Sequence, residues 1–524
     1  MHLQEDKMNL SYLLKTSTYR LNFPIFTRPI VNVIFFGSDN YALPHLHALE
    51  KHQYHHNDIQ ILCVVTTSDK TPVGCHCIQN KIDHVIWPRK ISNTSIVTDS
   101  IAQRIDILKN RSSDKSEKLL GIIVSFGRFL PPSLLSLFSY GCYNIHPSLL
   151  PRWKGSCPLL YTLLSGDRVT GITLFRLDPH HTTFDSGSVL YQQSIHLPSN
   201  GNVLITPEQL TTYLIPYSIK AMFEVILHPN LPHLIGIDQS VISKKFNIPV
   251  SYARIPQHHI GIIDWEKLSA KDIIRCWYAF QGSSVDLSTE LCLLSTQAEK
   301  EVDPLFKANF RLVECPFLVP EVHYASKNDD EDIGIYYANY DPKVMNYLNE
   351  AATLLNQPYS SSLPPGSFVY LRSQIDAKHH PMPFTFIACK PSNSNPGVDQ
   401  NHRHHHPRVS WIAVASFLVN WPNSPTSRHL TATDLYNGYF VNQAGLFKLP
   451  SVKREQITRQ LGVRYFGQFQ CVSSSSPPPS SLSGGSRSSS VFIKPWTELT
   501  PSILPSDLQL SCSIPNVVQN ANNK

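Results

Sequence analysis

The stretch GCYNIHPSLLPRWKG, residues Gly141–Gly155, is the most informative part of the chain. Cys142–His146 has the composition of a short strand, and Pro147 prevents that strand from continuing. Asn144 and His146 are two positions apart, so their side chains lie on the same face of the strand. Open α/β sheets bind ligands at the carboxyl ends of their strands, so an amide and an imidazole at this place indicate a catalytic site. A polar strand end with a hydrogen-bonded histidine is the alternative interpretation of these two residues alone.

Strand-like and helix-like segments alternate on the N-terminal side of this stretch. Short apolar runs predict strands at Val31–Gly37, Ile59–Thr67 and Gly121–Phe126, and amphipathic segments between them predict helices. This alternation predicts an α/β fold with a Rossmann-like, doubly wound and mostly parallel sheet. Only one glycine follows the first strand, so the glycine fingerprint of dinucleotide-binding sites is absent. The pattern of residues 75–120 is too weak to order its elements.

The composition of the chain bounds its class. Of its 524 residues, 42% are hydrophobic, which is enough for a large core divided over two or three units. The formal net charge of +6 permits an anionic partner without requiring one. Eleven cysteines without regular spacing indicate reduced intracellular thiols. Cys75-His76-Cys77 has no second ligand pair at zinc-ribbon spacing, so we interpret it as an ordinary loop and expect no metal.

Residues 1–30 differ in composition from the rest of the chain. No Asp or Glu occurs from Met8 to Val31, whereas Lys15, Arg20 and Arg28 stand among Ser, Thr, Tyr and Leu. This composition predicts a disordered mitochondrial presequence, and hence a location in the mitochondrial matrix. The apolar runs are too short for a membrane span, and no membrane contact is expected. A disordered N-terminus without a targeting role is the alternative.

The segment NIHPSLLPRWKGSCP, residues 144–158, resembles the signature of the folate-dependent formyltransferases. With a tryptophan at position 153, the segment resembles in particular the signature of the methionyl-tRNA formyltransferases within that superfamily. The resemblance extends over most of the chain through FFGSDNYALPHLHAL, SFGRFLP, SGDRVTGITLFRLD, FDSGSVLY and LTATDLYNGY. It implies an enzyme that transfers the formyl group of 10-formyltetrahydrofolate to the α-amino group of methionine on initiator Met-tRNA. The product, formyl-Met-tRNA, would serve the initiation of translation in the organelle.

The resemblance implies three catalytic residues, Asn144, His146 and Asp185. Formyl transfer between two nitrogens needs a hydrogen-bond donor for the developing oxyanion, a role that suits Asn144. It also needs a group that moves a proton between the two amines, and histidine, with an ordinary pKa of about 6.5, suits this role. Asp185 is expected to hold His146 in position. The extra stretch Pro179–Thr183 precedes Asp185, and displacement of the carboxylate by this stretch would remove the partner of His146.

Binding residues are also implied by the resemblance. The pocket for 10-formyltetrahydrofolate, a diffusible cosubstrate, is expected to be lined by Phe126, Gly127, Arg128, Ser148, Leu149 and Leu150. Arg152 and Lys154 are cations beside Trp153, and this combination suits phosphate contact with tRNA and stacking on its end. Anchoring of an exposed basic loop is an equal alternative for Trp153. No metal is needed, because the carbonyl of an N-formyl donor is already activated.

The chain is expected to divide into five parts. A presequence at 1–30 precedes a formyltransferase catalytic domain at 31–228 and a linker at 229–264. Alternating strand patterns and the resemblance predict a small OB-like β-barrel at 265–470 that binds tRNA, with disordered inserts near 322–365 and 391–408. A Ser- and Pro-rich disordered tail follows at 471–524. We expect a monomer.

Two other functions remain open from the sequence. A related folate-dependent formyltransferase that acts on a sugar nucleotide or a ribonucleotide amine would share the three catalytic residues. A degenerate descendant without activity would explain the many insertions.

Overall fold

The computed structural model describes the N-terminal half of the chain almost completely and the second half in segments. The described residues are 31–89, 94–111, 118–179, 183–197, 204–293, 306–320, 337, 340–355, 365–371, 373, 382–391, 409–420, 426–435, 463–465 and 500–508. The predicted presequence at 1–30 lies outside them. So do residues 392–408 of the second predicted insert and residues 471–499 and 509–524 of the predicted tail.

The N-terminal half is built on one seven-stranded sheet with the order β3-β2-β1-β4-β5-β6-β7. Its strands are β1 (Val31–Gly37), β2 (Ile59–Thr66), β3 (His84–Ile86), β4 (Lys118–Val124), β5 (Cys142–His146), β6 (Val169–Arg176) and β7 (Ser188–His196). The pairs from β3 to β5 are parallel, and those of β5 with β6 and of β6 with β7 are antiparallel. The prediction of a mostly parallel, doubly wound sheet is confirmed.

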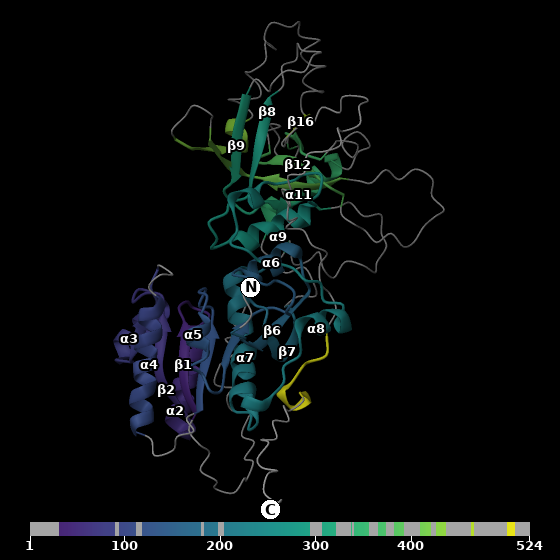
Figure 1. Cartoon of the computed structure of the whole chain (residues 1–524). Coiled ribbons are helices and arrows are strands. Elements are labelled where there is room, and N and C mark those ends of the chain that lie inside the picture. The colour runs from purple at the N-terminus through teal and green to yellow at the C-terminus, as the bar shows by residue number, and fades with distance from the viewer. Residues whose placement is uncertain are drawn as a thin grey trace, which may run out of the picture.

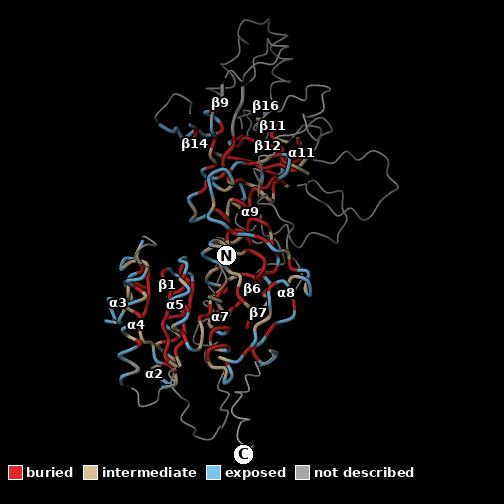
Figure 2. Tube along the Cα trace, in the orientation of Figure 1, coloured by how far each residue is buried: buried red, intermediate tan, exposed pale blue. Residues whose placement is uncertain are grey.

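Helices cover both faces of this sheet (Figure 1). They are α2 (Leu43–His56), α3 (Pro72–Asn80), α4 (Thr94–Arg111), α5 (Pro132–Leu135), α6 (Pro158–Ser165) and α7 (Pro207–Ile226). Val33 and Phe35 belong to the core shared with α2, α3, α6 and α7, whereas Ile34 and Phe36 belong to the core shared with α4 and α5. Successive residues of a strand point to opposite faces, so an uninterrupted apolar run fits a sheet covered on both sides. Figure 2 shows these strands as the buried centre of the domain.

Residues 75–120, for which the sequence predicted no order of elements, contain most of α3 and the whole of β3 and α4. The interpretation of Cys75-His76-Cys77 as a loop is wrong, because these residues lie within α3. The side chain of Thr71 caps this helix by accepting a hydrogen bond from the amide of Gly74, and Pro72 occupies the first turn. Threonine followed by proline is a helix start signal, and it could have identified the helix in advance.

Two antiparallel sheets form the C-terminal half. One has the order β15-β14-β9-β8 and the other β10-β13-β12-β11-β16. Their strands are β8 (Ser288–Leu293), β9 (Phe306–Leu312), β10 (Phe317–Leu318), β11 (Ser367–Val369), β12 (Thr385–Cys389), β13 (Ser410–Val414), β14 (Ser416–Asn420), β15 (Arg428–Thr431) and β16 (Val463–Tyr465). The described strands do not close into a barrel, so the predicted OB-like barrel is not found in this part of the chain.

The two halves share one core. Helix α9 (Ala270–Phe280) lies between α6 and the C-terminal strands in Figure 1. Ile273 on its buried face belongs to the same apolar cluster as Leu164 of α6 and Phe310 of β9. The side chain of Arg275 also donates a hydrogen bond to the carbonyl of Leu164 (3.3 Å). The C-terminal half is therefore packed onto the N-terminal half rather than joined to it only by the chain.

Three predicted irregular segments contain ordered structure. The predicted insert 322–365 includes α11 (Pro342–Leu355), whose Leu348 and Ala351 are buried against β12 and β13. The predicted linker 229–264 includes η2 (Leu231–His233), α8 (Gln239–Phe246) and η3 (His258–Gly261). The predicted disordered tail includes residues 500–508, with η6 (Pro505–Asp507), which pack against β7. The disorder predictions for residues 342–355 and 500–508 are corrected, because both segments bury apolar side chains.

None of the helices among the described residues combines the length and the apolar character that crossing a membrane requires.

A buried histidine predicts how stability depends on pH. His45 of α2 is fully buried, with Nδ1 2.9 Å from the carbonyl of Tyr41 and Nε2 2.8 Å from Ser218 Oγ of α7. Burial lowers the pKa of His45 from 6.5 to about 4. Between pH 6.5 and pH 4, His45 is protonated in the unfolded chain but not in the folded chain. The free energy of unfolding therefore falls as the pH drops from 6.5 towards 4. The full effect is roughly 3 kcal/mol at about 1.36 kcal/mol per pH unit.

We expect His45→Gln to reduce the loss of unfolding free energy between pH 7 and pH 4.5, measured by urea titration at each pH. His55→Gln, at an exposed position on the same helix, is the control and should retain the loss. An equal loss in His45→Gln and in the unmodified chain would contradict the assignment.

Candidate active site

Asn144 and His146 lie at the carboxyl end of β5, as the sequence predicted. The strand Cys142–His146 has the predicted bounds, and Asn144 lies opposite Ile123 of β4 and Phe175 of β6. His146 is buried and Asn144 is half-buried, and both line the large pocket of the catalytic domain. The site is therefore at the edge of the sheet where α/β folds bind their ligands.

Asp185 meets these two residues. It lies in the connection between β6 and β7 with a φ of +52°. Its Oδ2 accepts a hydrogen bond from the amide of Gly155 (2.7 Å), and its Oδ1 lies 3.4 Å from Asn144 Nδ2. The distance from Asp185 Oδ2 to His146 Nδ1 is 3.9 Å. Residues 180–182 of the extra stretch lie outside the described residues, and Asp185 keeps its place beside His146.

The orientation of His146 is set by a backbone carbonyl. His146 Nε2 lies 2.9 Å from the oxygen of Trp153. A carbonyl only accepts hydrogen bonds, so Nε2 carries a proton, and in the neutral ring the lone pair belongs to Nδ1, the nitrogen nearer to Asp185. At 3.9 Å the Asp185 carboxylate is too far to hold the ring by a hydrogen bond. In this structure the carbonyl of Trp153 orients the ring and Asp185 places a negative charge beside it, and positioning of His146 by Asp185 stays a prediction.

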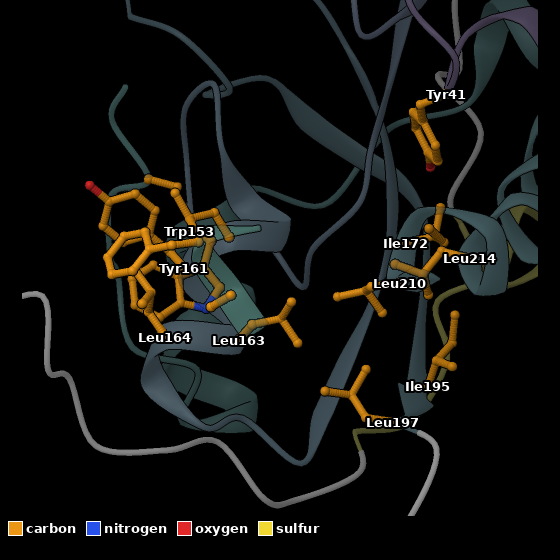
Figure 3. Close-up of a cluster of buried hydrophobic side chains, with 14 of the residues drawn as sticks. Tyr41, Trp153, Tyr161, Leu163, Leu164, Ile172, Ile195, Leu197, Leu210 and Leu214 are labelled. Carbon is orange, nitrogen blue, oxygen red and sulfur yellow. The ribbon is translucent and has the colours of Figure 1, made fainter. Parts of the chain in front are cut away.

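A buried ion pair fixes the loop that supplies this carbonyl. Arg152 and Trp153 are each 1% exposed. Arg152 Nε and Trp153 Nε1 both donate hydrogen bonds of 2.8 Å to Asp167 Oδ2, and Arg152 Nη2 bonds the other carboxylate oxygen. Trp153 also packs against Tyr161 in the buried cluster of Figure 3, with ring centroids 5.6 Å apart.

The predicted tRNA contacts of Arg152 and Trp153 are corrected, because buried side chains cannot reach an external partner. Asp167 is the residue that the sequence reasoning missed. Its position immediately after the glycine that ends α6 resembles a surface turn, and only the tertiary contact reveals its role.

Of the three residues predicted to contact tRNA, Lys154 is the one that lines the pocket. Its side chain is half-buried, and burial lowers its pKa, whereas the nearby carboxylates of Asp185 and Asp238 act in the opposite direction. A cation here can meet an anionic or polar group of a substrate inside the pocket. Contact of Lys154 with tRNA stays a prediction.

The six predicted folate residues separate into two groups. Phe126, Gly127 and Arg128 line the pocket. Ser148, Leu149 and Leu150 do not line it in the described part of the chain, and all three are buried. The chain turns into the core after Pro147, where the Ser148 hydroxyl donates to the carbonyl of Arg152 (2.7 Å). The expectation that these three residues wall the pocket is therefore corrected.

The pocket is large and is formed by both halves of the chain. Its volume is about 1440 Å³. The ends of β1, β4 and β5 supply one wall, and residues 252–256 and 281–284 supply parts of the opposite side. At the end of β4, the Ser125 hydroxyl donates a hydrogen bond to Asp39, which also accepts the amides of Tyr41 and Ala42 at 3.0 Å. Single drug-sized ligands occupy roughly 300–1000 Å³, so this pocket has room for parts of two substrates.

Two exposed aromatic side chains stand in this pocket that the sequence did not single out as binding residues. Phe129 is 45% exposed and Phe184 is 61% exposed, and their rings meet edge to face with centroids 5.8 Å apart. Exposed apolar side chains that gather in one patch mark ligand or partner contacts more often than singly exposed ones do. Phe184 directly precedes Asp185, so the same loop supplies an apolar surface and the carboxylate.

One group of side chains in the described residues has the composition of a metal site. His47, Glu50 and His76 offer ligand atoms within 4.8 Å of one another on α2 and α3. His76 Nε2 bonds the Glu50 carboxylate (2.9 Å), and His76 Nδ1 lies 3.2 Å from His47 Nε2. These residues do not line the pocket, so they take no part in its chemistry.

A comparison with known families gives a match in the N-terminal half of the chain. Residues 31–208 match the family model described as "Formyl transferase". This part of the chain is therefore similar to formyl transferases, and the matched region ends at the start of α7.

Comparison with individual proteins extends further. The chain is similar to the mitochondrial methionyl-tRNA formyltransferase of Rattus norvegicus, with 26% identity over 418 residues that cover 79% of each chain. It is also similar to the methionyl-tRNA formyltransferase of Prochlorococcus marinus subsp. pastoris, with 29% identity over 47% of this chain and 70% of the relative. Among solved structures, the phosphoribosylglycinamide formyltransferase of Bacillus halodurans aligns with 19% identity and a TM-score of 0.30, over 41% of this chain and 98% of its own.

The buried ion pair gives a testable prediction. Asp167→Asn leaves the Arg152 cation buried without its anion, and breaking a buried pair in this way costs about 3–5 kcal/mol. We expect a loss of unfolding free energy of that size in urea denaturation. Asp106→Asn on the exposed face of α4 is the control, with an expected change below about 0.5 kcal/mol. Equal stabilities of the two variants would show that the pair does not hold the loop.

Proposed function

We propose that this chain is a methionyl-tRNA formyltransferase, which moves a formyl group from 10-formyltetrahydrofolate to the amino group of methionine on initiator Met-tRNA. The observation that carries the proposal is the meeting of Asn144, His146 and Asp185 in the pocket of a formyl transferase domain. The names of the relatives in Rattus norvegicus and Prochlorococcus marinus support the choice of acceptor.

The reaction forms one C–N bond and breaks another. The neutral α-amine attacks the formyl carbon, and the carbonyl oxygen becomes an oxyanion in a tetrahedral intermediate. Asn144 donates an N–H to this oxygen, since its amide faces the pocket beside the other two residues. The intermediate then collapses, and the bond between the formyl carbon and N10 of the folate breaks. Charge stabilisation by a fixed donor is a large term in such reactions.

His146 moves the proton that this exchange requires. Nδ1 is the nitrogen assigned to this step, because Nε2 is bonded to the carbonyl of Trp153 and His146 lines the pocket. Nδ1 takes the proton that the attacking amine loses and gives it to the leaving nitrogen of the folate. The resulting imidazolium is stabilised by Asp185, whose carboxylate oxygen is 3.9 Å away, and by the carbonyl on the other side of the ring.

The pocket and the C-terminal sheets suit two substrates of very different size. Phe126, Gly127 and Arg128 at the end of β4 are assigned to the folate side. Lys154 and Arg254, which face the pocket near the junction of the two halves, are assigned to the tRNA side. The two antiparallel sheets take the role predicted for an OB-like barrel, a platform for the body of the tRNA.

The site of action is proposed from the relatives and from the sequence. The relative in Rattus norvegicus is named mitochondrial, and residues 1–30 have the composition of a presequence. We assign the enzyme to the mitochondrial matrix as a monomer that needs no metal for this reaction and does not bind membranes.

The catalytic roles are tested with purified protein, 10-formyltetrahydrofolate and Met-charged initiator tRNA. Asn144→Ala removes the oxyanion donor and should lower kcat by about 10²–10³ with little change in KM for the tRNA. His146→Ala removes the proton carrier and should lower kcat by about 10²–10⁴. The readout is the rate of formylation, measured as the amount of formyl-methionine that is recovered at each time point after the tRNA ester is hydrolysed.

His55→Ala serves as the matched control for His146, since His55 is exposed on α2 and remote from the pocket lining. Faster formylation of an amino sugar nucleotide or of glycinamide ribonucleotide than of Met-tRNA would contradict the proposed acceptor. Near-normal kcat in Asn144→Ala or in His146→Ala would contradict the role assigned to that residue.

A further inference from the structure

The outer edge of β7 is covered by a segment from the far end of the chain. β7 is the last strand in the sheet order, so one of its sides has no partner strand in that sheet. Ile503 pairs with Gln192 there, with hydrogen bonds of 2.8 and 2.9 Å exchanged between their backbones. The hydroxyl of Ser194 donates to the carbonyl of Thr500 (2.7 Å), across a separation of 306 residues. Figure 1 shows this segment in yellow beside β7.

The segment also contributes to the apolar core. The side chain of Ile503 is 5% exposed, and Pro505 is buried. Ile503 belongs to a cluster that contains Leu149 and Leu150, the residues that follow the catalytic strand, and Phe175 of β6. The segment therefore packs against the loop that joins His146 to Trp153.

Polar contacts connect the same strand pair to that loop. Gln192, whose backbone pairs with Ile503, directs its side chain inwards, where Nε2 donates to the carbonyl of Leu150 (2.8 Å) and contacts Thr173 Oγ1 (2.9 Å). Thr173 Oγ1 in turn donates to the carbonyl of Ser148 (2.7 Å) and accepts the amide of Leu150 (3.1 Å). The carbonyls of Ser148 and Leu150 and the amide of Leu150 are therefore all hydrogen-bonded to side chains of β6 or β7.

We propose that Thr500–Leu508 is a C-terminal strap that closes the sheet edge and positions the catalytic loop from behind. The hydrogen bonds of the strap go to Gln192 and Ser194, neither of which lines the pocket, and among the described residues its one link to the lining is the apolar cluster that Ile503 shares with Phe175. The strap therefore acts on the loop through Gln192 and the Ser148–Pro151 turn. That turn leads to the Trp153 carbonyl, which fixes His146. Misplacement of a catalytic group by about 1 Å can cost about 10²-fold in rate, so release of the strap lowers turnover without removing any reacting group.

The test compares two neighbouring positions in the full chain. Ile503→Ser removes the buried anchor, whereas Leu504→Ser changes a side chain that is 37% exposed and serves as the control. Two measurements are made: hydrogen exchange of the segment that contains Gln192, and kcat with 10-formyltetrahydrofolate and Met-tRNA. We expect Ile503→Ser to exchange at least about tenfold faster at Gln192 and to lose about tenfold or more in kcat, with KM for each substrate within about twofold. Leu504→Ser and the conservative variant Ile503→Val should both show the exchange rate at Gln192 and the kcat of the unmodified chain.

Further variants separate the outcomes. If Ile503→Ser fails to fold by circular dichroism, Ser194→Ala, which removes only the hydrogen bond to Thr500, should show a smaller change in the same two measurements. Unchanged exchange at Gln192, or a kcat within about twofold of the unmodified chain, would overturn the strap. The kcat measurement rests on the proposed formyl transfer. Absence of formylation in the unmodified chain would refute that function, while the exchange comparison would still decide whether the strap is docked.

Discussion

The contact between Asp167 and the pair Arg152–Trp153 is the constraint on which the site depends. Two side chains that the sequence presents as a basic, aromatic surface are turned inwards to one buried carboxylate. Their turn places the Trp153 carbonyl on His146 Nε2, and this hydrogen bond decides which ring nitrogen carries the proton. The orientation of the histidine ring therefore depends on a buried ion pair formed by other residues. Such a pair is costly to desolvate and is retained here with a geometric role.

The three proposed catalytic residues come from segments with different structural support. Asn144 and His146 are held by the central strand β5, between β4 and β6. Asp185 lies on a connection, but the Gly155 amide binds its carboxylate and Gln239 of α8 binds its backbone carbonyl (2.9 Å). The loop behind the site is supported from β6, β7 and residues 500–508. Sites on strands are positioned more precisely than sites on loops, and here the loops are bonded to the strands that flank them.

The second half of the chain completes the pocket rather than hanging beside it. Helix α9 shares its core with α6, and the turn that follows it, residues 281–284, lines the same pocket as Asn144. A continuous core between the halves fixes their relative position, because interior packing tolerates little displacement. An acceptor bound to the C-terminal sheets would thus meet the catalytic strand at a defined distance.

The sequence by itself determined the local elements: the strand Cys142–His146 ending at Pro147, the buried parallel strands, and the residue types needed for formyl transfer. Short continuous apolar runs, prolines and family motifs are local signals, and they were sufficient for these. Tertiary structure decided which residues face the pocket. Arg152 and Trp153 are buried only because Asp167, on another segment, neutralises and binds them. Ser148–Leu150 are buried only because β6, β7 and Ile503 surround them. Burial depends on contacts between distant segments, and no local pattern around these residues encodes those contacts.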